Sequence, residues 1–291
     1  MNRAGPTITI IGAGAVGTAW LDFFKDRGYP VTSVWKSETG YLADEDYHIH
    51  RELNRPLPES DEEIGDWVFI TTPDDSIAPA AKLLAESNIH WTNRTVIHCS
   101  GSLSADVLKS LKERGARTIS VHPIQTFQKG DGKEKLEGVT ITLQGDEETV
   151  ENLREVVLQL HSKPVLLSEQ QKMAVHIAAV FASNYLVALL NTSEQILKES
   201  GVDAGIEIMV PLIRQTVENV LTKGTGTSLT GPISRGDENT VKNHLHYLSK
   251  DKAEARLYKA LGQACLNIVQ EKESLSEARI EHIRKALGGM P

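Results

Sequence analysis

The sequence predicts an α/β fold: a doubly wound, mostly parallel sheet followed by an all-α C-terminal domain. In the first half of the chain, apolar β-rich runs alternate with segments of helical periodicity, which is typical of a parallel sheet with helices on both faces. After residue 167 the strand-like runs stop and helical patterns follow one another. A length of 291 residues suggests two domains. We therefore predict a sheet domain at 1–167 and a helical domain at 168–291.

The strands of the predicted sheet are short apolar runs rich in β-branched residues. We expect seven of them, at residues 7–11, 31–35, 67–71, 95–98, 118–121, 139–143 and 164–167. Between several of them lie helical patterns, at 15–26, 75–85, 104–114 and 147–160. The acidic stretch 37–66 shows no clear period, so we expect an irregular crossover there.

Helical patterns account for nearly all of the second half of the chain. We expect helices at 169–200, 204–222, 238–248, 252–270 and about 276–287. Pro211 falls in the first third of the second of these and is expected to kink it. The glycine-rich stretch 223–237 breaks the pattern, which predicts an ordered loop.

Composition excludes several classes of function. The formal net charge is −8, whereas proteins that bind nucleic acid or anionic membranes present basic surfaces. Two cysteines far apart in sequence, with no secretory signal, lead us to expect reduced thiols and a cytoplasmic protein. The apolar run 174–190 is short for a bilayer span, so we interpret it as a buried helix and expect no membrane partner.

A glycine-rich turn follows the first predicted strand and opens the first predicted helix. Its sequence has the G-x-G-x-x-G pattern, which in this strand–turn–helix context indicates a dinucleotide site of the Rossmann type. Gly12 permits the tight turn, Gly14 lets a diphosphate approach the backbone, and Gly17 allows close contact between helix and strand. The predicted cofactor-binding residues of the turn are Gly12, Ala13, Gly14, Ala15, Val16 and Gly17. The alternative is a glycine-rich turn without a ligand.

The end of the second strand distinguishes between the two pyridine dinucleotides. An NAD site usually carries a carboxylate there, for the ribose hydroxyl. Here the residues are Lys36 and Ser37, while Glu38 comes slightly late. A lysine and a hydroxyl suit a 2′-phosphate, so we predict NADP and keep NAD as the alternative. Lys36 could also be only a surface charge.

Three later strand ends are expected at the same edge of the sheet, because ligands bind outside the carboxyl ends of parallel strands. Thr72, Pro73 and Asp74 follow the third strand and are predicted to face the nicotinamide. The loop Ser100-Gly101-Ser102 follows the fourth and is predicted to hold the substrate. His122 borders the same crevice. The spacing of His98, Cys99 and His122 matches no standard zinc pattern, so we expect no metal.

With these residues in place, the chain resembles the group of 6-phosphogluconate dehydrogenases, ketopantoate reductases and pyrroline-5-carboxylate reductases. Within that group it is most similar to a bacterial family of Rossmann-like oxidoreductases with a C-terminal domain of unknown function. The stretches that carry this resemblance are HCSGSLSADVL (98–108), SVHPIQTF (120–127), VHIAAVFASNYLVALL (175–190) and LTGPISRGD (229–237). The resemblance implies an NADP-dependent oxidoreductase, and one branch is similar to an alternative ketopantoate reductase.

The resemblance also implies a catalytic lysine early in the first long helix of the second domain, with an asparagine one turn later. Lys172 falls on the lysine position, and His176 takes the place of the asparagine. Positions i and i+4 share a helix face, so either residue is a candidate proton donor. Asn184 lies two further turns along and is the third candidate catalytic residue.

The stretch 231–237 supplies a candidate substrate anchor. Arg235 could hold a substrate carboxylate in a bidentate fork, and by resemblance it could act across a dimer interface. Asp237 is instead a candidate for the N-cap of the helix that begins near residue 238. His244 and His246 either line the same cleft or are surface histidines.

The function expected from these residues is the reduction by NADPH of a small 2-oxo acid, β-oxo acid or cyclic imine, with a ketopantoate-like acid as one possibility. The runner-up hypothesis is a non-catalytic NADP-binding sensor or scaffold. A third is an enzyme that uses a deazaflavin as its hydride partner. Because the helix at 174–190 is apolar around most of its circumference, we also expect a homodimer.

Overall fold

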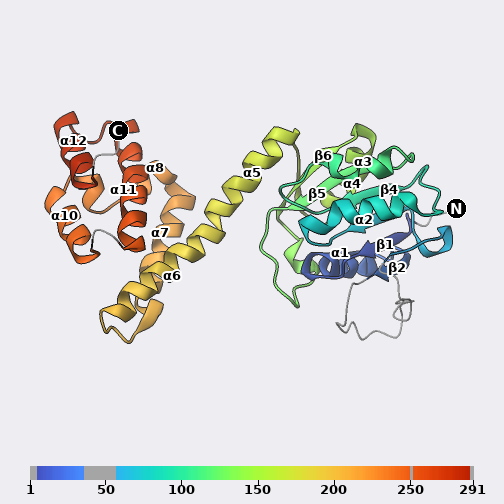
Figure 1. Ribbon diagram of the computed structural model, residues 1–291, viewed down its shortest axis with the longest axis horizontal. Helices are drawn as coiled ribbons and strands as arrows, with labels where there is room; N and C mark the ends of the chain where they lie inside the picture. Colours follow the sequence, from blue (N-terminus) through green and yellow to red (C-terminus); the bar gives the residue numbers. More distant parts are fainter. Residues whose placement is uncertain (1–4, 36–56, 250–251, 289–291) are drawn as a thin grey trace. The chain divides into compact units, whose positions relative to one another are not determined.

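The computed structural model describes residues 5–35, 57–249 and 252–288. The chain divides into two compact units, Met1–Tyr185 and Leu186–Pro291, which Figure 1 colours from blue to yellow-green and from yellow to red. The domain boundary predicted at 167 coincides with the end of the last strand. The compact units divide later, because the first long helix after the sheet contacts β6 and the loop after β4.

The first unit is built on a seven-stranded sheet with the order β2-β1-β3-β4-β5-β6-β7. All neighbouring strands pair in parallel except β5 and β6, which are antiparallel. This confirms the predicted doubly wound, mostly parallel α/β sheet. The strands are β1 (Ile8–Ile11), β2 (Val31–Trp35), β3 (Trp67–Ile70), β4 (Thr95–His98), β5 (Arg117–Pro123), β6 (Thr140–Gly145) and β7 (Lys163–Leu166).

Helices cover both faces of this sheet, and each face has its own apolar core. The helices of the first unit are α1 (Ala15–Asp26), α2 (Asp74–Glu86), α3 (Lys109–Lys112), α4 (Glu147–Gln159) and α5 (Glu169–Ala182), with 3-10 turns η1 (Asp61–Glu63), η2 (Ala105–Leu108) and η3 (Lys133–Lys135). One core holds apolar residues of α1 and α4, and the other those of α2 and α3. Alternate strand residues enter opposite cores, as the period of two requires: Ile10 packs under α1 and Ile11 under α2.

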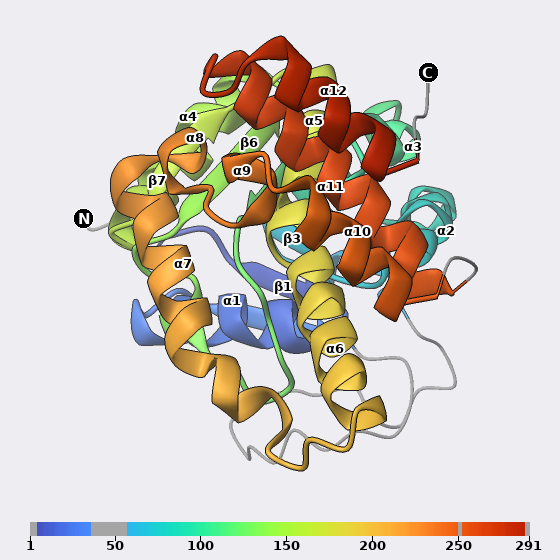
Figure 2. The same ribbon diagram turned by 90° about the vertical axis from the view of Figure 1, so that its left-hand side faces the viewer.

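The second unit is helical, which confirms the predicted all-α C-terminal region. Its elements are α6 (Asn184–Glu199), η4 (Gly205–Met209), α7 (Val210–Lys223), α8 (Thr225–Ser228), α9 (Pro232–Arg235), α10 (Glu238–Tyr247), α11 (Ala253–Glu271) and α12 (Glu277–Ala286). The core of this unit lies among α9, α10, α11 and α12, drawn in orange to red in Figure 2. Helices α6 and α7 contribute no buried residue to it.

Three local predictions for the helical half were wrong. The expected single helix at 169–200 is two helices, α5 and α6, which meet at Ser183 (φ −119°, ψ −73°). Pro211 does not kink a helix but lies in the first turn of α7, where its missing N–H has no intrahelical partner to lose. The stretch 223–237 contains the one-turn helices α8 and α9 rather than only a loop.

The expectation of a buried helix at 174–190 was also wrong. The segment Glu169–Glu199 is long and apolar enough to cross a membrane by length and composition, and none of its most apolar window is buried. Its exposed apolar side chains include Ile177, Phe181 and Val187. An exposed apolar surface of this extent is typical of an interaction site.

Candidate functional site

The glycine turn between β1 and α1 packs tightly against the end of β3. Gly12 has φ +99°, and a Cβ there would lie 2.7 Å from the backbone nitrogen of Thr72. A Cβ on Gly17 would lie 2.3 Å from the carbonyl oxygen of Gly12. The Thr71 hydroxyl donates to that same oxygen at 2.6 Å. The turn is therefore closed on the side of the sheet, and only glycine fits at these two positions.

On its other side the turn is open. Gly14 is the N-cap of α1 and is exposed, and a Cβ on it would meet no atom within 4 Å. Gly14 has no side chain with which to cap α1. Among the described residues, the N–H groups of the first turn have no intrahelical acceptor and can bind an outside one. Donors of this kind and the positive end of the helix dipole form an anion site. Ala13 is buried, while Ala15 and Val16 are half-buried beside the opening.

The residues after β3 border the same turn. The hydroxyl oxygen of Thr72 is buried and has no hydrogen-bond partner within the described part of the chain. Pro73 is the N-cap of α2, and Asp74 is its first residue. A buried hydroxyl without a partner costs free energy, so Thr72 is a group that a ligand could satisfy. The predicted residues Lys36 and Ser37 lie outside the described residues.

The loop after β4 is held by a network of hydrogen bonds. The hydroxyls of Ser100 and Ser102 both donate to Oδ2 of Asp74, at 2.8 and 2.7 Å. The N–H of Ser100 donates to Nδ1 of His98, whose Nε2 is 3.1 Å from the carbonyl oxygen of Ser104. Both serine hydroxyls are thus engaged with Asp74 and not free to donate to a substrate. Burial lowers the pKa of His98 to about 4, in agreement with a neutral ring that accepts at one nitrogen and donates at the other.

Lys172 reaches this loop from α5. Its Nζ donates to the carbonyl oxygen of Ser100 at 2.6 Å, and the residue is 3% exposed. The sheet register explains the approach: His98 pairs with Ser120 and Ser120 with Gln144. Because β7 ends beside β6 at this level, α5 begins close to the end of β4. A capping box formed by Ser168 and Gln171 fixes that start.

Burial is the main cause that lowers the pKa of Lys172, to about 8. An ammonium group in a largely apolar surrounding loses hydration, which favours the neutral amine. The negative charge of Asp74 acts in the opposite direction. Lys172 therefore still carries its proton at neutral pH, and it gives it up more readily than an exposed lysine.

His122 and His176 approach the loop at Gly101. A Cβ on Gly101 would lie 2.5 Å from Nδ1 of His176 and 2.9 Å from Nε2 of His122. The centroids of the two rings are 6.1 Å apart, with a T-shaped arrangement. Burial, and then the positive charge of Lys172, lower the pKa of His122 to about 4. Only glycine allows two imidazoles to come this close to the loop.

The structure thus brings together most of the predicted polar residues of the first unit. The cluster that we call the Gly101 cluster consists of Asp74, His98, Ser100, Gly101, Ser102, His122, Lys172 and His176. The sequence analysis named His122 only as a border of the crevice. Its position at the end of β5 was the available signal, but its proximity to His176 depends on sheet register. Within the described residues, no group of three or more His, Cys, Asp and Glu side chains is arranged to hold a metal ion.

Cys99 lies within the same loop but takes no part in its hydrogen bonds. Burial raises the pKa of its thiol to about 12, and the nearby Lys172 only partly opposes this. The thiolate is the reactive form of cysteine, so Cys99 is chemically quiet. It packs against the core under α1.

The remaining predicted site residues lie on other elements. Asn184 is the first residue of α6 and is exposed. Arg235 is exposed at the end of α9, in the second unit. Asp237 accepts from the N–H and the hydroxyl of Thr240, which confirms it as the N-cap of α10. His244 is bound through Nδ1 to the hydroxyl of Tyr258 at 2.9 Å.

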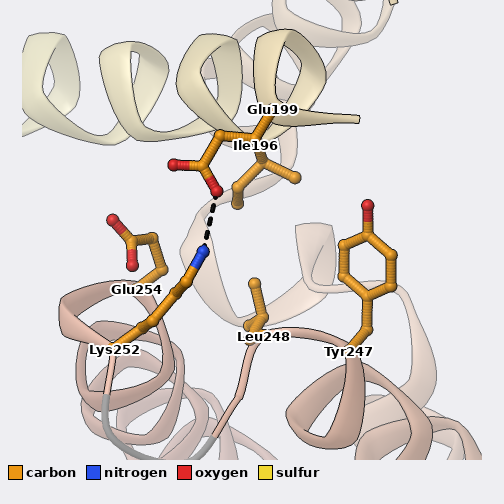
Figure 3. Close-up of a pocket in the computed structure, with 6 residues that line it drawn as sticks. All are labelled: Ile196, Glu199, Tyr247, Leu248, Lys252 and Glu254. Atoms are coloured by element: carbon orange, nitrogen blue, oxygen red, sulfur yellow. Dashed lines mark hydrogen bonds and ion pairs between the residues drawn. The ribbon is translucent and has the colours of Figure 1, made fainter. Parts of the chain in front are cut away.

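A cavity of about 200 Å³ lies within the second unit. The residues that line it, drawn in Figure 3, are Ile196, Glu199, Tyr247, Leu248, Lys252 and Glu254. The Lys252 ammonium donates to Glu199 at 2.9 Å across it. Lys252, the cation of this cavity, is therefore already paired, and none of the predicted site residues lines the cavity.

Two family models match this chain. Residues 1–123 match the family model described as a Rossmann-like domain. Residues 139–265 match the model described as a domain of unknown function, DUF2520. The chain thus contains a Rossmann-like domain followed by a DUF2520 domain, as the resemblance in the sequence indicated. Among curated proteins, none matches the chain.

Solved structures show the same fold over almost the whole chain. A candidate NADP oxidoreductase from Bacteroides fragilis is 23% identical, with a TM-score of 0.70 over 90% of this chain and 98% of that one. A protein from Thermotoga maritima is 21% identical, with a TM-score of 0.65 over 91% and 99%. An imine reductase from Myxococcus stipitatus, in complex with NADP+, is 16% identical, with a TM-score of 0.54 over 97% and 94%. At these identities the likeness shows the fold.

Proposed function

We propose that this protein is an NADPH-dependent oxidoreductase that reduces the carbonyl or imine group of a small carboxylate. The observation that carries the proposal is the juxtaposition at one edge of the sheet of an open glycine turn and a cluster of proton-carrying side chains. The turn offers open space at Gly14 and the backbone N–H groups at the start of α1, which have no intrahelical acceptor. The Gly101 cluster supplies Lys172 and His176. Structural neighbours described as an NADP oxidoreductase and an NADP+-bound imine reductase support the same function.

The residues of the glycine turn fit a dinucleotide on structural grounds. The open space at Gly14 and the uncapped start of α1 suit a diphosphate, and the unpaired hydroxyl of Thr72 borders the same turn. We propose that Thr72, Pro73 and Asp74 lie beside the nicotinamide, and that Lys36 and Ser37 hold the 2′-phosphate. The cofactor would supply a hydride, and the chain would supply orientation and a proton.

The protein's own part in the reaction is proton delivery and placement of the substrate. Addition of a hydride to a carbonyl or imine leaves charge on oxygen or nitrogen that a nearby acid must neutralise. Lys172 and His176 are one helical turn apart and both approach the Ser100–Ser102 loop. Asn184 as a positioning residue and Arg235 as a carboxylate anchor remain predictions from the sequence.

The test is binding followed by turnover. Purified protein should quench or shift NADPH fluorescence with a Kd in the micromolar range. A panel of 2-oxo acids that includes ketopantoate, β-oxo acids and cyclic imines should then identify a substrate that consumes NADPH. Lys36→Ala should weaken NADPH more than NADH, because only NADPH carries the 2′-phosphate. Failure to bind either dinucleotide would contradict the proposal, and binding without turnover across the panel would favour a sensor.

We further propose that the protein acts as a homodimer. Within the second unit, α6 and α7 expose large apolar side chains, among them Val187 (66%), Leu212 (64%) and Leu221 (76%). Apolar surface of this extent is typical of an interface, and a second copy of the chain offers an equally apolar face. Sedimentation should give twice the monomer mass, and Leu212→Glu with Leu221→Glu should shift it to monomer. An unmodified chain that sediments as a monomer at micromolar concentration would contradict the dimer.

A further inference from the structure

The two basic residues of α5 that approach the Gly101 cluster differ in what their side chains already do. Lys172 is bound to the protein, whereas Nδ1 of His176 faces Gly101 with no hydrogen-bond partner among the bonds of the described residues. We propose that His176 is the proton donor of the reaction and that Lys172 is a positioning residue that fixes the loop after β4. This inference rests on the proposed function and specifies the roles within it.

Lys172 is placed to hold the loop. Its Nζ donates to the carbonyl oxygen of Ser100 at 2.6 Å, the short distance expected of a charge-assisted bond. At 3% exposure the side chain has little contact with solvent. The same Ser100 donates its hydroxyl to Asp74, so the loop is fixed from α5 and from α2 together. If Nζ moved to a substrate, the buried carbonyl of Ser100 would lose its donor from Lys172, which is unfavourable for a buried acceptor.

His176 is placed to deliver a proton. It lies one turn after Lys172 on α5 and is half-buried, so it keeps contact with solvent. Its Nδ1 points at the Cα of Gly101, where the absence of a side chain leaves the loop backbone accessible. An acid at this position meets a substrate that rests on the loop, and it can regain its proton from water.

Two further imidazoles lie near His176, and neither adds a positive charge to the cluster at neutral pH. His122 faces it from β5 and His98 lies behind the loop at the end of β4, and burial holds the pKa of both rings near 4. Both are therefore neutral at pH 7 and do not repel a second cation. The Asp74 carboxylate, on α2, offsets the charge of Lys172.

The step balances without any further reactant. The carbonyl carbon of the substrate gains a hydride, which is one proton and two electrons, and NADPH is oxidised to NADP+. The π pair of the carbonyl moves to oxygen, and the proton of the His176 imidazolium is transferred to that oxygen. A hydroxy acid and a neutral imidazole result, and the imidazole takes its next proton from water. For an imine, nitrogen replaces oxygen and an amine is formed.

The experiment compares His176→Gln with Lys172→Met, and uses His282→Gln, an exposed histidine of α12, as the matched control. We expect His176→Gln to lower kcat by about 100-fold or more, to remove one limb of the pH profile of kcat, and to leave NADPH affinity and melting temperature unchanged. Lys172→Met should raise KM and lower the melting temperature while the pH limb persists. The control should equal wild type in all five quantities: kcat, KM, the pH profile, NADPH affinity and melting temperature.

Two results would overturn the assignment and leave the proposed function standing. One is a His176→Gln enzyme with more than half of the wild-type kcat. The other is a Lys172→Met enzyme that loses turnover and the pH limb at unchanged KM and melting temperature. A wild-type protein that binds NADPH but reduces no member of the panel would instead refute the proposed function, and the assignment with it.

Discussion

The two loops at the carboxyl edge of the sheet differ in how far their polar groups are already satisfied. In the turn between β1 and α1, the helix start is uncapped and the Gly14 side is open. In the loop after β4, the side chains of Ser100 and Ser102 are bound to Asp74 and the Ser100 carbonyl to Lys172. The first loop keeps backbone donors for a ligand. In the second loop, the serine side chains form hydrogen bonds within the protein that fix the conformation of the loop.

This difference shows that serines and glycines at strand ends have different roles, some structural and some in ligand binding. Serines at Ser100 and Ser102 suggest substrate contacts in the sequence, but their hydroxyls are engaged with Asp74. Gly12 and Gly17 allow the backbone of the turn to pack closely, while Gly14 leaves space through which a ligand can approach the turn. Four substitutions can break or sharpen this contrast.

The largest effect is expected from Gly17→Ala, because the new Cβ would lie 2.3 Å from a backbone oxygen and 2.5 Å from the Thr71 hydroxyl. Overpacking against backbone should cost about 3 kcal/mol and lower the melting temperature of the first unit by roughly 6–12 °C. Differential scanning calorimetry measures it. A melting temperature equal to wild type would mean that the turn is looser than described.

Next in size is the pH dependence that Lys172 imposes on stability. Its pKa is about 8 in the folded protein against 10.5 ordinarily, so unfolding takes up a proton between these values. The free energy of unfolding should therefore rise with pH across this window, and Lys172→Met should remove about 1.5 kcal/mol of that rise between pH 8 and 9.5. Urea unfolding of both proteins at the two pH values gives the difference, and parallel curves would refute the lowered pKa.

The third effect concerns ligand access at Gly14. Gly14→Ala places a methyl group in open space, with no atom within 4 Å, so stability should not change. The same methyl group would meet a diphosphate, and NADPH affinity should fall about tenfold, or about 1.4 kcal/mol. Fluorescence titration measures the affinity, and Gly17→Ala is the contrasting case in which stability falls. Unchanged affinity would place the dinucleotide elsewhere.

The smallest effect is expected at acid pH from His122. Its pKa falls from 6.5 to about 4 on folding, so the unfolded chain binds a proton between these values and stability is lost as pH drops through them. His122→Asn should reduce that loss by about 1 kcal/mol between pH 6.5 and 5.5. The pKa of His98 is also lowered to about 4, so part of the loss of stability at acid pH persists in this variant. His246→Asn, in an exposed position on α10, should leave the acid profile unchanged.

Local patterns in the sequence predicted the helices and strands better than the points at which helices are interrupted. The expected helix 15–26 and strand 31–35 coincide with α1 and β2, because periodicity and flanking turn residues act within a few positions. The break at Ser183 left no such signal, since the apolar pattern continues through it. The glycines of the stretch 223–237 favour a loop, but α8 and α9 each form a single helical turn within it.

The candidate site could be predicted only as far as the strand-end rule reaches. That rule selected the residues after β1, β3, β4 and β5, which do gather at one edge of the sheet. It could not reveal that Asp74 binds both serines, or that His122 and His176 meet over Gly101. Those contacts depend on sheet register and on where α5 begins, which no local spacing encodes.

The chemically quiet thiols have a practical consequence for following the protein in solution. Burial raises the pKa of Cys99 to about 12 and also raises that of Cys265, so maleimide reagents should react slowly with both at neutral pH. A cysteine introduced at an exposed position in each unit would then accept a fluorophore in the otherwise native chain. A change in the emission of such a dye beside the glycine turn would report the binding of a dinucleotide.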